Sequence, residues 1–424
     1  MKVSFFSRRA AKNVGWLVAG RILHMALAFL VNLLTARYLG PSNYGLVNYA
    51  ALYTAFFTSF ATLGLSSLLL KDFMDDPEGA GTTVGTAIAM RLLSSTLSAV
   101  SILAIVAAVD RGERLTMTVV ALYSMSLIFQ AFDTIQYWFQ SRLESKYATI
   151  ATSVGYIIVS FYKVLLLVLG KDVRWFAISN TIDYAVAAIV FLGLYKWRGG
   201  PRLHISPAKG RALLRQSGSF ILCGLMVSVY NCTDRFMLKH LLDEASVGYY
   251  ATATSLATVW TFVLSAIIDS ITPGIMQAHR TDQAQFVRHN RQLYALVFYF
   301  SVAVSAVITL LARPAVSLLY GEAYLPAVRP MQVITWYTAF VARGAWVVCE
   351  GKQKYLTPLY IGSALVNVAL NFLLIPCWGA TGAAVASLLT QISTTFVFPL
   401  LLRPLRPNGL LMCQAVLLRD VFPK

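Results

Sequence analysis

Long apolar segments separated by short polar connectors run along the whole chain. Twelve of them approach the roughly 20 residues that an α-helix needs to cross about 30 Å of hydrocarbon. They cover approximately residues 14–36, 45–70, 83–108, 115–139, 147–169, 175–195, 216–238, 248–273, 292–312, 331–349, 356–376 and 379–402. The pattern predicts an all-α polytopic membrane protein with about twelve transmembrane helices.

The composition agrees with this class. Of 424 residues, 58% are hydrophobic and 12% are charged, about half the roughly 25% charged share of soluble domains. A soluble globule, a disordered chain and a disulfide-stapled secreted module are therefore excluded. The net charge of +17 would suggest a nucleic-acid partner in a soluble chain. In a membrane chain the positions of the positive residues matter more than their sum.

These positions predict the topology. With the N-terminus placed inside and the sides alternating, 22 of the 35 Lys and Arg residues fall on the inner side and 8 outside. The remaining five lie within or at the edge of spans. Positive residues are enriched in cytoplasmic loops, so both termini are predicted to be cytoplasmic and no nucleic-acid partner is implied. The basic start is interpreted as the flank of a retained first helix, because the apolar stretch after it is too long for a signal peptide.

The longest and most basic connector divides the predicted spans into six and six. We expect an N-terminal six-helix lobe over residues 1–198, a basic cytoplasmic linker over 199–215, a C-terminal six-helix lobe over 216–402 and a cytoplasmic tail over 403–424. Because six is even, the lobes share one orientation, as parallel repeats require. A weak internal sequence similarity supports this, since Gly45 and Ala50 match Gly248 and Ala253 at the same offset of 203 residues.

Ionisable side chains inside the spans are the candidates for function, because their cost in hydrocarbon favours a cavity or the bundle interior. Helical periodicity places Arg21, His24 and Asn32 on one face of the first span, and Asn231 and Arg235 on one stripe of the seventh. The other members of this group are Arg91, Lys163, Arg343, Asp133, Asp183, Asp234 and Asp269. Five positive against four negative groups indicates charge pairs rather than a purely cationic passage.

Three motifs then resemble one known family. They are Ala36-Arg37-Tyr38-Leu39-Gly40-Pro41 with Tyr44-Gly45, Asp234-Arg235 with Val247-Gly248-Tyr249-Tyr250-Ala251, and Asn367, Asn371, Ile375-Pro376 and Gly379 with Gly382-Ala383-Ala384. In this order, over about residues 13–400, they resemble the polysaccharide transporter family. That family comprises the oligosaccharide flippases of the multidrug/oligosaccharidyl-lipid/polysaccharide (MOP) flippase superfamily.

The resemblance implies a function. Such a protein moves an undecaprenyl-diphosphate-linked oligosaccharide, such as an O-antigen or exopolysaccharide repeat unit, across the bacterial inner membrane by ion-coupled alternating access. Its partners would be the polyprenyl-diphosphate-linked glycan, the bilayer and a polysaccharide polymerase or chain-length regulator. The substrate-binding candidates are then Arg21, Asn32, Arg91, Asn231, Arg235 and Arg343. The candidates for ion coupling or charge pairing are His24, Asp133, Lys163, Asp234 and Asp269. No catalytic residue, metal or cofactor is implied.

The glycines and prolines of these motifs also have a physical interpretation. Gly40-Pro41 is expected to end a helix in a tight turn, and Gly45 or Gly248 to let the next helix begin close to its neighbour. Pro376 and Gly379 are expected to do the same in the last hairpin.

Two alternatives stay open. A multidrug or cation antiporter of the same superfamily is the nearest, because the charge tally does not separate it from a flippase. A membrane glycan ligase, polymerase or glycosyltransferase is the other, with Asp72, Asp75 and Asp76 as an imaginable metal cluster. We interpret these carboxylates as a solvated loop, since no zinc-ligand spacing, nucleophile elbow or phosphate-binding glycine loop accompanies them.

Overall fold

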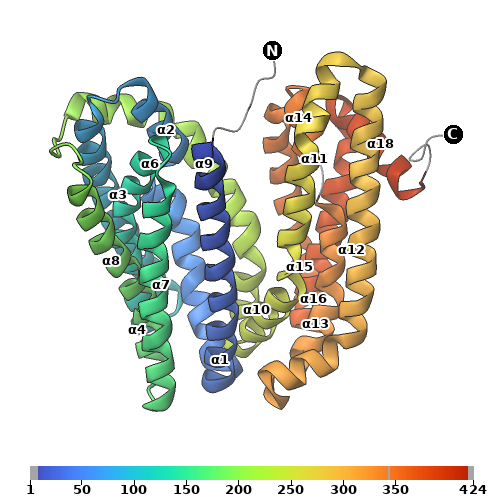
Figure 1. Cartoon of the computed structure of the whole chain (residues 1–424). Helices are drawn as coiled ribbons and strands as arrows, with labels where there is room; N and C mark the ends of the chain where they lie inside the picture. The colour runs from blue at the N-terminus through green and yellow to red at the C-terminus, as the bar shows by residue number, and fades with distance from the viewer. Residues whose placement is uncertain (1–7, 342–343, 419–424) are drawn as a thin grey trace. The chain divides into compact units, whose positions relative to one another are not determined.

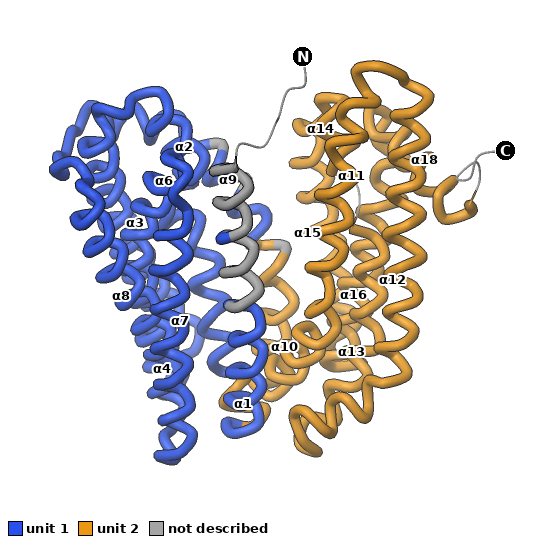
Figure 2. The backbone as a smooth tube through the Cα atoms, in the orientation of Figure 1, with its two compact units in different colours: residues 1–39, 46–228 blue, residues 40–45, 229–424 orange. Residues whose placement is uncertain are grey.

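The computed structural model describes residues 8–341 and 344–418, apart from the side chains of residues 8–15, 17–23, 219, 223 and 230 (Figure 1). Every regular element in those ranges is a helix, which confirms the all-α prediction. The chain forms two compact units, coloured separately in Figure 2. Unit 1 comprises residues 1–39 and 46–228, and unit 2 comprises residues 40–45 and 229–424.

The first half of the chain supplies the helices of unit 1, with a 3-10 turn in the fourth predicted span. The elements are α1 (Arg8–Ala61), α2 (Ser66–Asp75), α3 (Ala80–Val109), α4 (Arg114–Ser124), α5 (Ser126–Phe129), η1 (Gln130–Asp133), α6 (Thr134–Ser141), α7 (Ser145–Val168), α8 (Val173–Trp197) and α9 (Pro207–Leu241). Both α1 and α9 also contribute residues to unit 2.

The second half is more interrupted. Its elements are α10 (Glu244–Thr258), α11 (Thr261–Thr281), α12 (Gln283–Tyr320), η2 (Glu322–Ala327), α13 (Val328–Ile334), η3 (Thr335–Phe340), α14 (Gly344–Cys349), η4 (Gln353–Tyr355), α15 (Leu356–Trp378), α16 (Ala380–Ile392), the π-helical η5 (Ser393–Val397), α17 (Phe398–Leu401), η6 (Arg403–Leu405) and α18 (Arg406–Val416). A predicted span is thus often built from two or three shorter helices.

The helices are suited to a membrane. Nine described helical stretches are long and apolar enough to span one, and a bent pair over residues 207–229 raises the number to ten. One of the nine, His24–Asp75, contains two predicted spans, and the predicted span 331–349 is broken by η3. Large apolar side chains such as Phe161 and Leu310 are exposed, which is costly in water and suited to contact with lipid.

The expected break at Gly40 is present. Gly40 has φ 72° inside the otherwise helical stretch of α1, and Pro41 begins the following helical segment. A positive φ is readily adopted by glycine, and proline is tolerated in the first turn of a helix because its missing N–H is not needed there. The stretch is therefore two helices joined at a sharp kink.

Two glycines form the tight helix contact that the sequence predicted. A Cβ atom at Gly45 would stand within 2.9 Å of the Gly248 nitrogen and even closer to the Glu244 carbonyl oxygen. A Cβ atom at Gly248 would in turn collide with the Pro41 carbonyl oxygen. Within unit 2, residues 40–45 therefore pack backbone to backbone against the start of α10.

The last hairpin also agrees with its prediction. Gly379, with φ 58°, separates α15 from α16. A Cβ atom at Gly382 would stand 2.9 Å from the Ile375 nitrogen and collide with the Leu374 carbonyl oxygen. Small residues at this point let the two helices approach closely.

The basic connector is partly ordered against unit 1. A Cβ atom at Gly85 of α3 would stand 2.9 Å from the His204 nitrogen, and Ser206 N donates to Thr86 Oγ1 at 2.9 Å. Helix α9 begins at Pro207, so the second half of the predicted linker is helical. In this part of the chain the units divide between Ser228 and Val229. The six-helix lobes expected over residues 1–198 and 216–402 stay a prediction.

The C-terminal tail contains a packed helix. Leu411, Met412 and Ala415 of α18 are buried in the apolar core of unit 2. Tyr294 Oη of α12 donates to Asn408 Oδ1 at 2.7 Å. The residues up to Val416 therefore belong to unit 2.

Candidate functional site

A buried carboxylate in unit 2 is the centre of the best-defined polar network. Asp234 of α9 is 8% exposed. Its Oδ2 accepts hydrogen bonds from Tyr250 Oη at 2.6 Å and from Ser387 Oγ, and its Oδ1 accepts from Asn371 Nδ2 at 2.7 Å. The donors come from α10, α15 and α16, so this one side chain links four helices. Buried charges require such partners, because an unpaired one would be strongly destabilising.

A cavity of about 390 Å³ lies beside this network, within the usual size range of small-molecule sites. We call it the Asp234 cavity. Among the described residues, its charged lining residues are Asp234 and Arg235, and the remaining wall is polar or aromatic apart from Ile334. The lining residues are Asn231, Asp234, Arg235, Tyr250, Thr254, Thr258, Ile334, Tyr337, Asn367 and Ser387.

Arg235 is available to a ligand in this cavity. Its Nε is buried and has no hydrogen-bond partner in the described part of the chain. Asp234 does not neutralise it through an ion pair within 4 Å; the carboxylate instead receives the neutral donors described above. Adjacent residues on a helix do not face each other, which explains this separation. A guanidinium with unused donors can bind a carboxylate or phosphate oxygen.

A second polar cluster lies within unit 1. Arg91 of α3 is 3% exposed and donates from Nη1 to Thr134 Oγ1 at 3.0 Å. The charge of Asp133 acts on Arg91, and that of Asp183 acts on Lys163. Each cation of this cluster therefore has a carboxylate nearby, and in the described part of the chain neither cation forms an ion pair within 4 Å.

Of the remaining predicted site residues, His24, Asn32 and Asp269 are described, and none of them belongs to either hydrogen-bonded cluster. The ring of His24 lies tilted against that of Tyr156, with centroids 4.1 Å apart. Asn32 is half-buried in α1, and Asp269 is exposed on α11. The Arg21 side chain and the whole of Arg343 lie outside the described residues. The candidates Asn231, Asp234 and Arg235 thus come together, and Arg91, Asp133 and Lys163 form the second group.

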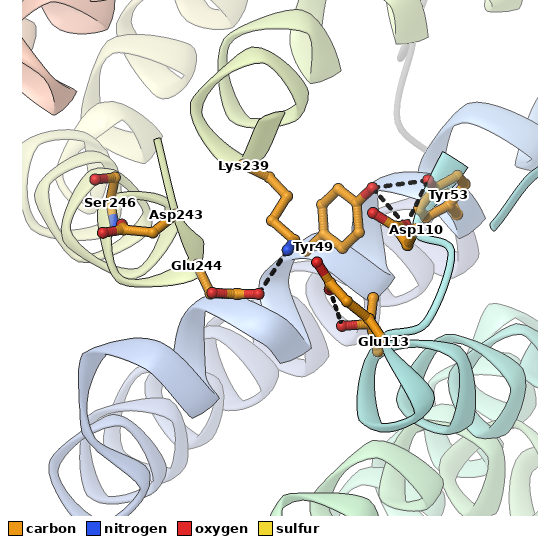
Figure 3. Close-up of polar contacts among 9 residues, drawn as sticks. Tyr49, Tyr53, Asp110, Glu113, Lys239, Asp243, Glu244 and Ser246 are labelled. Carbon is orange, nitrogen blue, oxygen red and sulfur yellow. Dashed lines mark hydrogen bonds and ion pairs between the residues drawn. The ribbon is translucent and has the colours of Figure 1, made fainter. Parts of the chain in front are cut away.

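Another network in unit 1 was not predicted from the sequence. Asp110, at the end of α3, accepts a hydrogen bond from Tyr49 Oη at 3.0 Å, and Tyr49 and Tyr53 hydroxyls are 2.8 Å apart (Figure 3). In α3 the carboxylate follows a long apolar run, and nothing in its local pattern indicates two tyrosines 57 and 61 residues away.

Unit 2 has its own polar group at the α9–α10 turn. Lys239 Nζ pairs with Glu244 Oε1 at 2.5 Å, and Asp243 Oδ1 accepts from the Ser246 backbone nitrogen at 2.7 Å (Figure 3). Asp243 therefore caps the N-terminus of α10, a position that favours aspartate.

Metal binding finds no preformed site. In residues 8–341 and 344–418 no group of three or more His, Cys, Asp or Glu side chains is placed to hold a metal ion. Asp72 and Asp75 lie in α2 rather than in the loop expected from the sequence. Asp72 pairs with Lys209 at 2.8 Å and accepts from Thr83 Oγ1 at 2.7 Å. Asp76 Oδ1 accepts from the Gly79 nitrogen at 2.9 Å.

Apolar spanning helices, two compact helical units and a polar cavity with buried charges define a polytopic membrane protein with a transporter-like architecture. The sequence profile of the polysaccharide biosynthesis protein family matches residues 10–279. The chain belongs to this family, which confirms the resemblance drawn from its motifs.

Known proteins agree with this assignment. The chain is 20% identical over 396 residues to the capsular polysaccharide biosynthesis protein CapF of Staphylococcus aureus, covering 90% of this chain and 96% of the relative. An inward-facing multidrug resistance MATE transporter of the MOP superfamily shares the fold with a TM-score of 0.70 at 16% identity, covering 94% of this chain and 96% of that one.

The lipid II flippase MurJ, in an inward closed conformation, has a TM-score of 0.69 at 12% identity, covering 97% and 94% of the two chains. A MOP superfamily transporter from Pyrococcus furiosus has a TM-score of 0.62 at 15% identity, covering 96% and 97%. The fold is therefore that of MOP-superfamily transporters.

Proposed function

We propose that this chain is a flippase for an undecaprenyl-diphosphate-linked oligosaccharide. It moves the sugar unit across a bacterial inner membrane by alternating access, and both chain termini are cytoplasmic. Membership of the polysaccharide biosynthesis family and similarity to CapF support a role in making a surface glycan. The fold shared with a lipid II flippase supports a lipid-linked cargo.

The observation that carries the proposal is the unpartnered Arg235 in a polar cavity. A diphosphate and several sugar hydroxyls cannot cross hydrocarbon without hydrogen-bond partners. Arg235 supplies a cation for the phosphate, while Asn231 and Asn367 supply amides for hydroxyl groups. Arg91 is a weaker candidate for the same role, because it is buried beside Asp133 and Thr134.

Ion coupling acts at Asp234 in this proposal. The carboxylate borders the same cavity as Arg235. An ion or proton bound at Asp234 would therefore change the electrostatic potential at the place where the substrate binds. Asn371 Oδ1, beside the carboxylate, is buried and has no partner among the described residues. An oxygen-rich pocket of this kind suits a small cation. In this proposal Asp133 and Lys163 act in charge pairing within unit 1 rather than in ion coupling.

The proposal is tested with full-length protein in liposomes that carry the host's lipid-linked repeat unit. Arg235→Gln is compared with Arg288→Gln, which changes an exposed arginine of α12. Losing a hydrogen bond to a charged group costs about 1.5–3 kcal/mol, or roughly 10- to 150-fold in affinity. We expect Arg235→Gln to lower transport at limiting substrate at least tenfold, and Arg288→Gln to leave it unchanged at equal protein levels. If both variants transported the substrate equally well, Arg235 would have no role in substrate recognition.

A multidrug or cation antiporter is the second candidate, favoured by the MATE fold. Deletion in the host separates the two. Loss of surface glycan without a change in drug susceptibility supports the flippase, and the reverse result supports the antiporter. Covalent change of the lipid-linked glycan by the purified protein would instead indicate a membrane enzyme.

A further inference from the structure

A second cavity in unit 2 lies where α10, α13 and α16 begin and α15 ends. It has a volume of about 450 Å³ and is bordered by Trp378, Tyr249, Arg329, Ser246 and Thr381. We call it the Trp378 cavity. The four helices α10, α13, α15 and α16 contribute to both cavities. On α16, Thr381 borders the Trp378 cavity and Ser387 the Asp234 cavity, a separation of about 9 Å along the helix axis at 1.5 Å per residue.

The polar side chains around the Trp378 cavity form no hydrogen bonds or ion pairs with other described residues. Within residues 8–341 and 344–418, the side chains of Arg329, Ser246 and Thr381 have no hydrogen-bond or ion-pair partner. Trp378 is 57% exposed, although its indole is large and apolar. In the same ranges the Tyr249 hydroxyl has no hydrogen-bond partner, while its ring meets the edge of Tyr324. The aromatic rings and the hydrogen-bond donors thus surround one space, and among the described residues these donors form no hydrogen bonds with one another.

The chemistry of the wall selects a class of ligand. Trp and Tyr rings offer an apolar face and a polar edge, which suits the alternating C–H and hydroxyl surface of a sugar ring. Among the described residues, Arg329 is the only charged one that lines the space, and none of its lining residues is a carboxylate. The first N–H groups of α16, which follow the positive-φ residue Gly379, point to the same end and favour negative charge. The cavity is therefore suited to a hydroxylated, neutral or acidic sugar and unsuited to a cation.

The predicted topology places this end on the extracytoplasmic side. The connectors before α10, before α13 and before α16 all fall outside when the N-terminus is inside. A sugar unit that leaves the Asp234 cavity toward that side would next meet the Trp378 cavity. We propose that the Trp378 cavity is a carbohydrate subsite, which holds the part of the glycan distal to the diphosphate during release. The inference rests on the proposed flippase function.

Transport of two substrates tests the subsite. Liposomes are loaded with undecaprenyl diphosphate carrying either one sugar or the complete repeat unit. Trp378→Ala and Arg329→Gln are compared with Trp175→Ala and Arg313→Gln, which change exposed residues at other span ends. We expect the first two variants to lower transport of the complete unit at least tenfold and to move the single-sugar lipid within twofold of wild type. The two control variants should move both substrates normally.

The outcomes separate this inference from the proposed function. If the wild-type protein transported neither substrate, both the flippase function and the carbohydrate subsite would be refuted. If wild type and all variants moved both substrates equally well, the flippase would stand and the subsite would be refuted. An equal loss of both substrates in Trp378→Ala would mark Trp378 as a membrane anchor and would also refute the subsite.

A binding measurement separates a glycan from a lipid headgroup, which could also satisfy Arg329 and Trp378. The repeat unit is released from its lipid by mild acid, labelled with a fluorophore and titrated against wild type in phosphatidylcholine nanodiscs. We expect binding that weakens at least tenfold in Trp378→Ala and is unchanged when phosphatidylglycerol is added. Displacement of the glycan by phosphatidylglycerol would overturn the carbohydrate assignment.

Discussion

At the residue scale, the separation of Asp234 from Arg235 is the feature with the largest functional consequence. Each could have neutralised the other, and the pair would then offer nothing to a ligand. Instead Asp234 accepts three hydrogen bonds from neutral side chains on other helices. Arg235 keeps its charge and a free donor beside the cavity. The same cavity can therefore hold an anionic cargo near one residue and a coupling ion near the other.

Asp234→Asn separates coupling from simple passage. The amide keeps one accepting oxygen, but its NH₂ group meets hydroxyl or amide donors that previously had an acceptor. We expect the rate of transport against a substrate gradient to fall at least tenfold, while transport down the gradient continues. Imposed proton and sodium gradients are applied in turn to identify the ion. Asp269→Asn, on the exposed face of α11, is the matched control, and gradient-driven transport by Asp234→Asn equal to wild type would contradict coupling at Asp234.

The sequence identified the charged members of this site but not their partners. Asp234 and Arg235 were recognisable because a charge in an apolar run is costly unless it has a function or a partner. Tyr250, Asn371 and Ser387 are 16, 137 and 153 residues from Asp234. Their convergence depends on how α9, α10, α15 and α16 pack, which periodicity within one helix does not contain. Asn367 and Asn371 entered the sequence analysis only through the family resemblance.

At the element scale, the paired glycines Gly45 and Gly248 determine how two helices begin. The repeated spacing of 203 residues places them at equivalent points of the two halves, and the structure brings them into one backbone contact. Close helix approach of this kind gives dispersion contacts that substitute for the missing hydrophobic drive between helices in lipid. The sequence predicted a close helix approach at each glycine, and the structure adds that the two approaches form one contact.

Gly248→Ala tests this contact. The new methyl group would collide with the Pro41 carbonyl oxygen, a backbone atom that moves only with its helix. Overpacking of this kind costs about 1–3 kcal/mol. Gly193→Ala is the control, because a Cβ atom there meets nothing within 4 Å and alanine favours a helix by about 0.5–1 kcal/mol. Unfolding in detergent should show a lower midpoint for the first variant and an equal or higher one for the second; a stable Gly248→Ala would exclude the tight contact.

The interruptions of the helices were not predictable. The fourth span contains the 3-10 turn η1, the tenth contains η3, and the twelfth contains the π-helical η5. Hydropathy averages over about 20 residues and cannot register a change in hydrogen-bond pattern over four to six. Gln391 Nε2 and Thr395 Oγ1 both donate to the Phe340 carbonyl oxygen, at 2.8 and 3.1 Å. Two side chains of the twelfth span thus donate to a carbonyl at the end of η3, which helps to satisfy the backbone of the broken tenth span.

At the scale of the whole molecule, the positions of the basic residues predict the membrane topology. The proposed direction of transport depends on that topology. The basic connector and the start of α9 pack on α2 through the Lys209–Asp72 pair and on α3 through the Ser206–Thr86 hydrogen bond. If this face is cytoplasmic, the Trp378 cavity opens on the opposite side, because α10, α13 and α16 each begin after an outer connector. The flippase proposal and the carbohydrate subsite therefore depend on one topological assignment, which is directly measurable.

Cysteine accessibility in intact cells measures that assignment. In a background without native cysteines, Arg111→Cys and Arg202→Cys place single thiols at exposed positions of two connectors. The positive-inside distribution puts residue 111 outside and residue 202 inside. We expect a membrane-impermeant maleimide to label Arg111→Cys in intact cells, and Arg202→Cys only after the membrane is permeabilised. The reverse pattern would invert the molecule, so that the Trp378 cavity would meet the sugar unit on entry and the release step proposed for it would become a loading step.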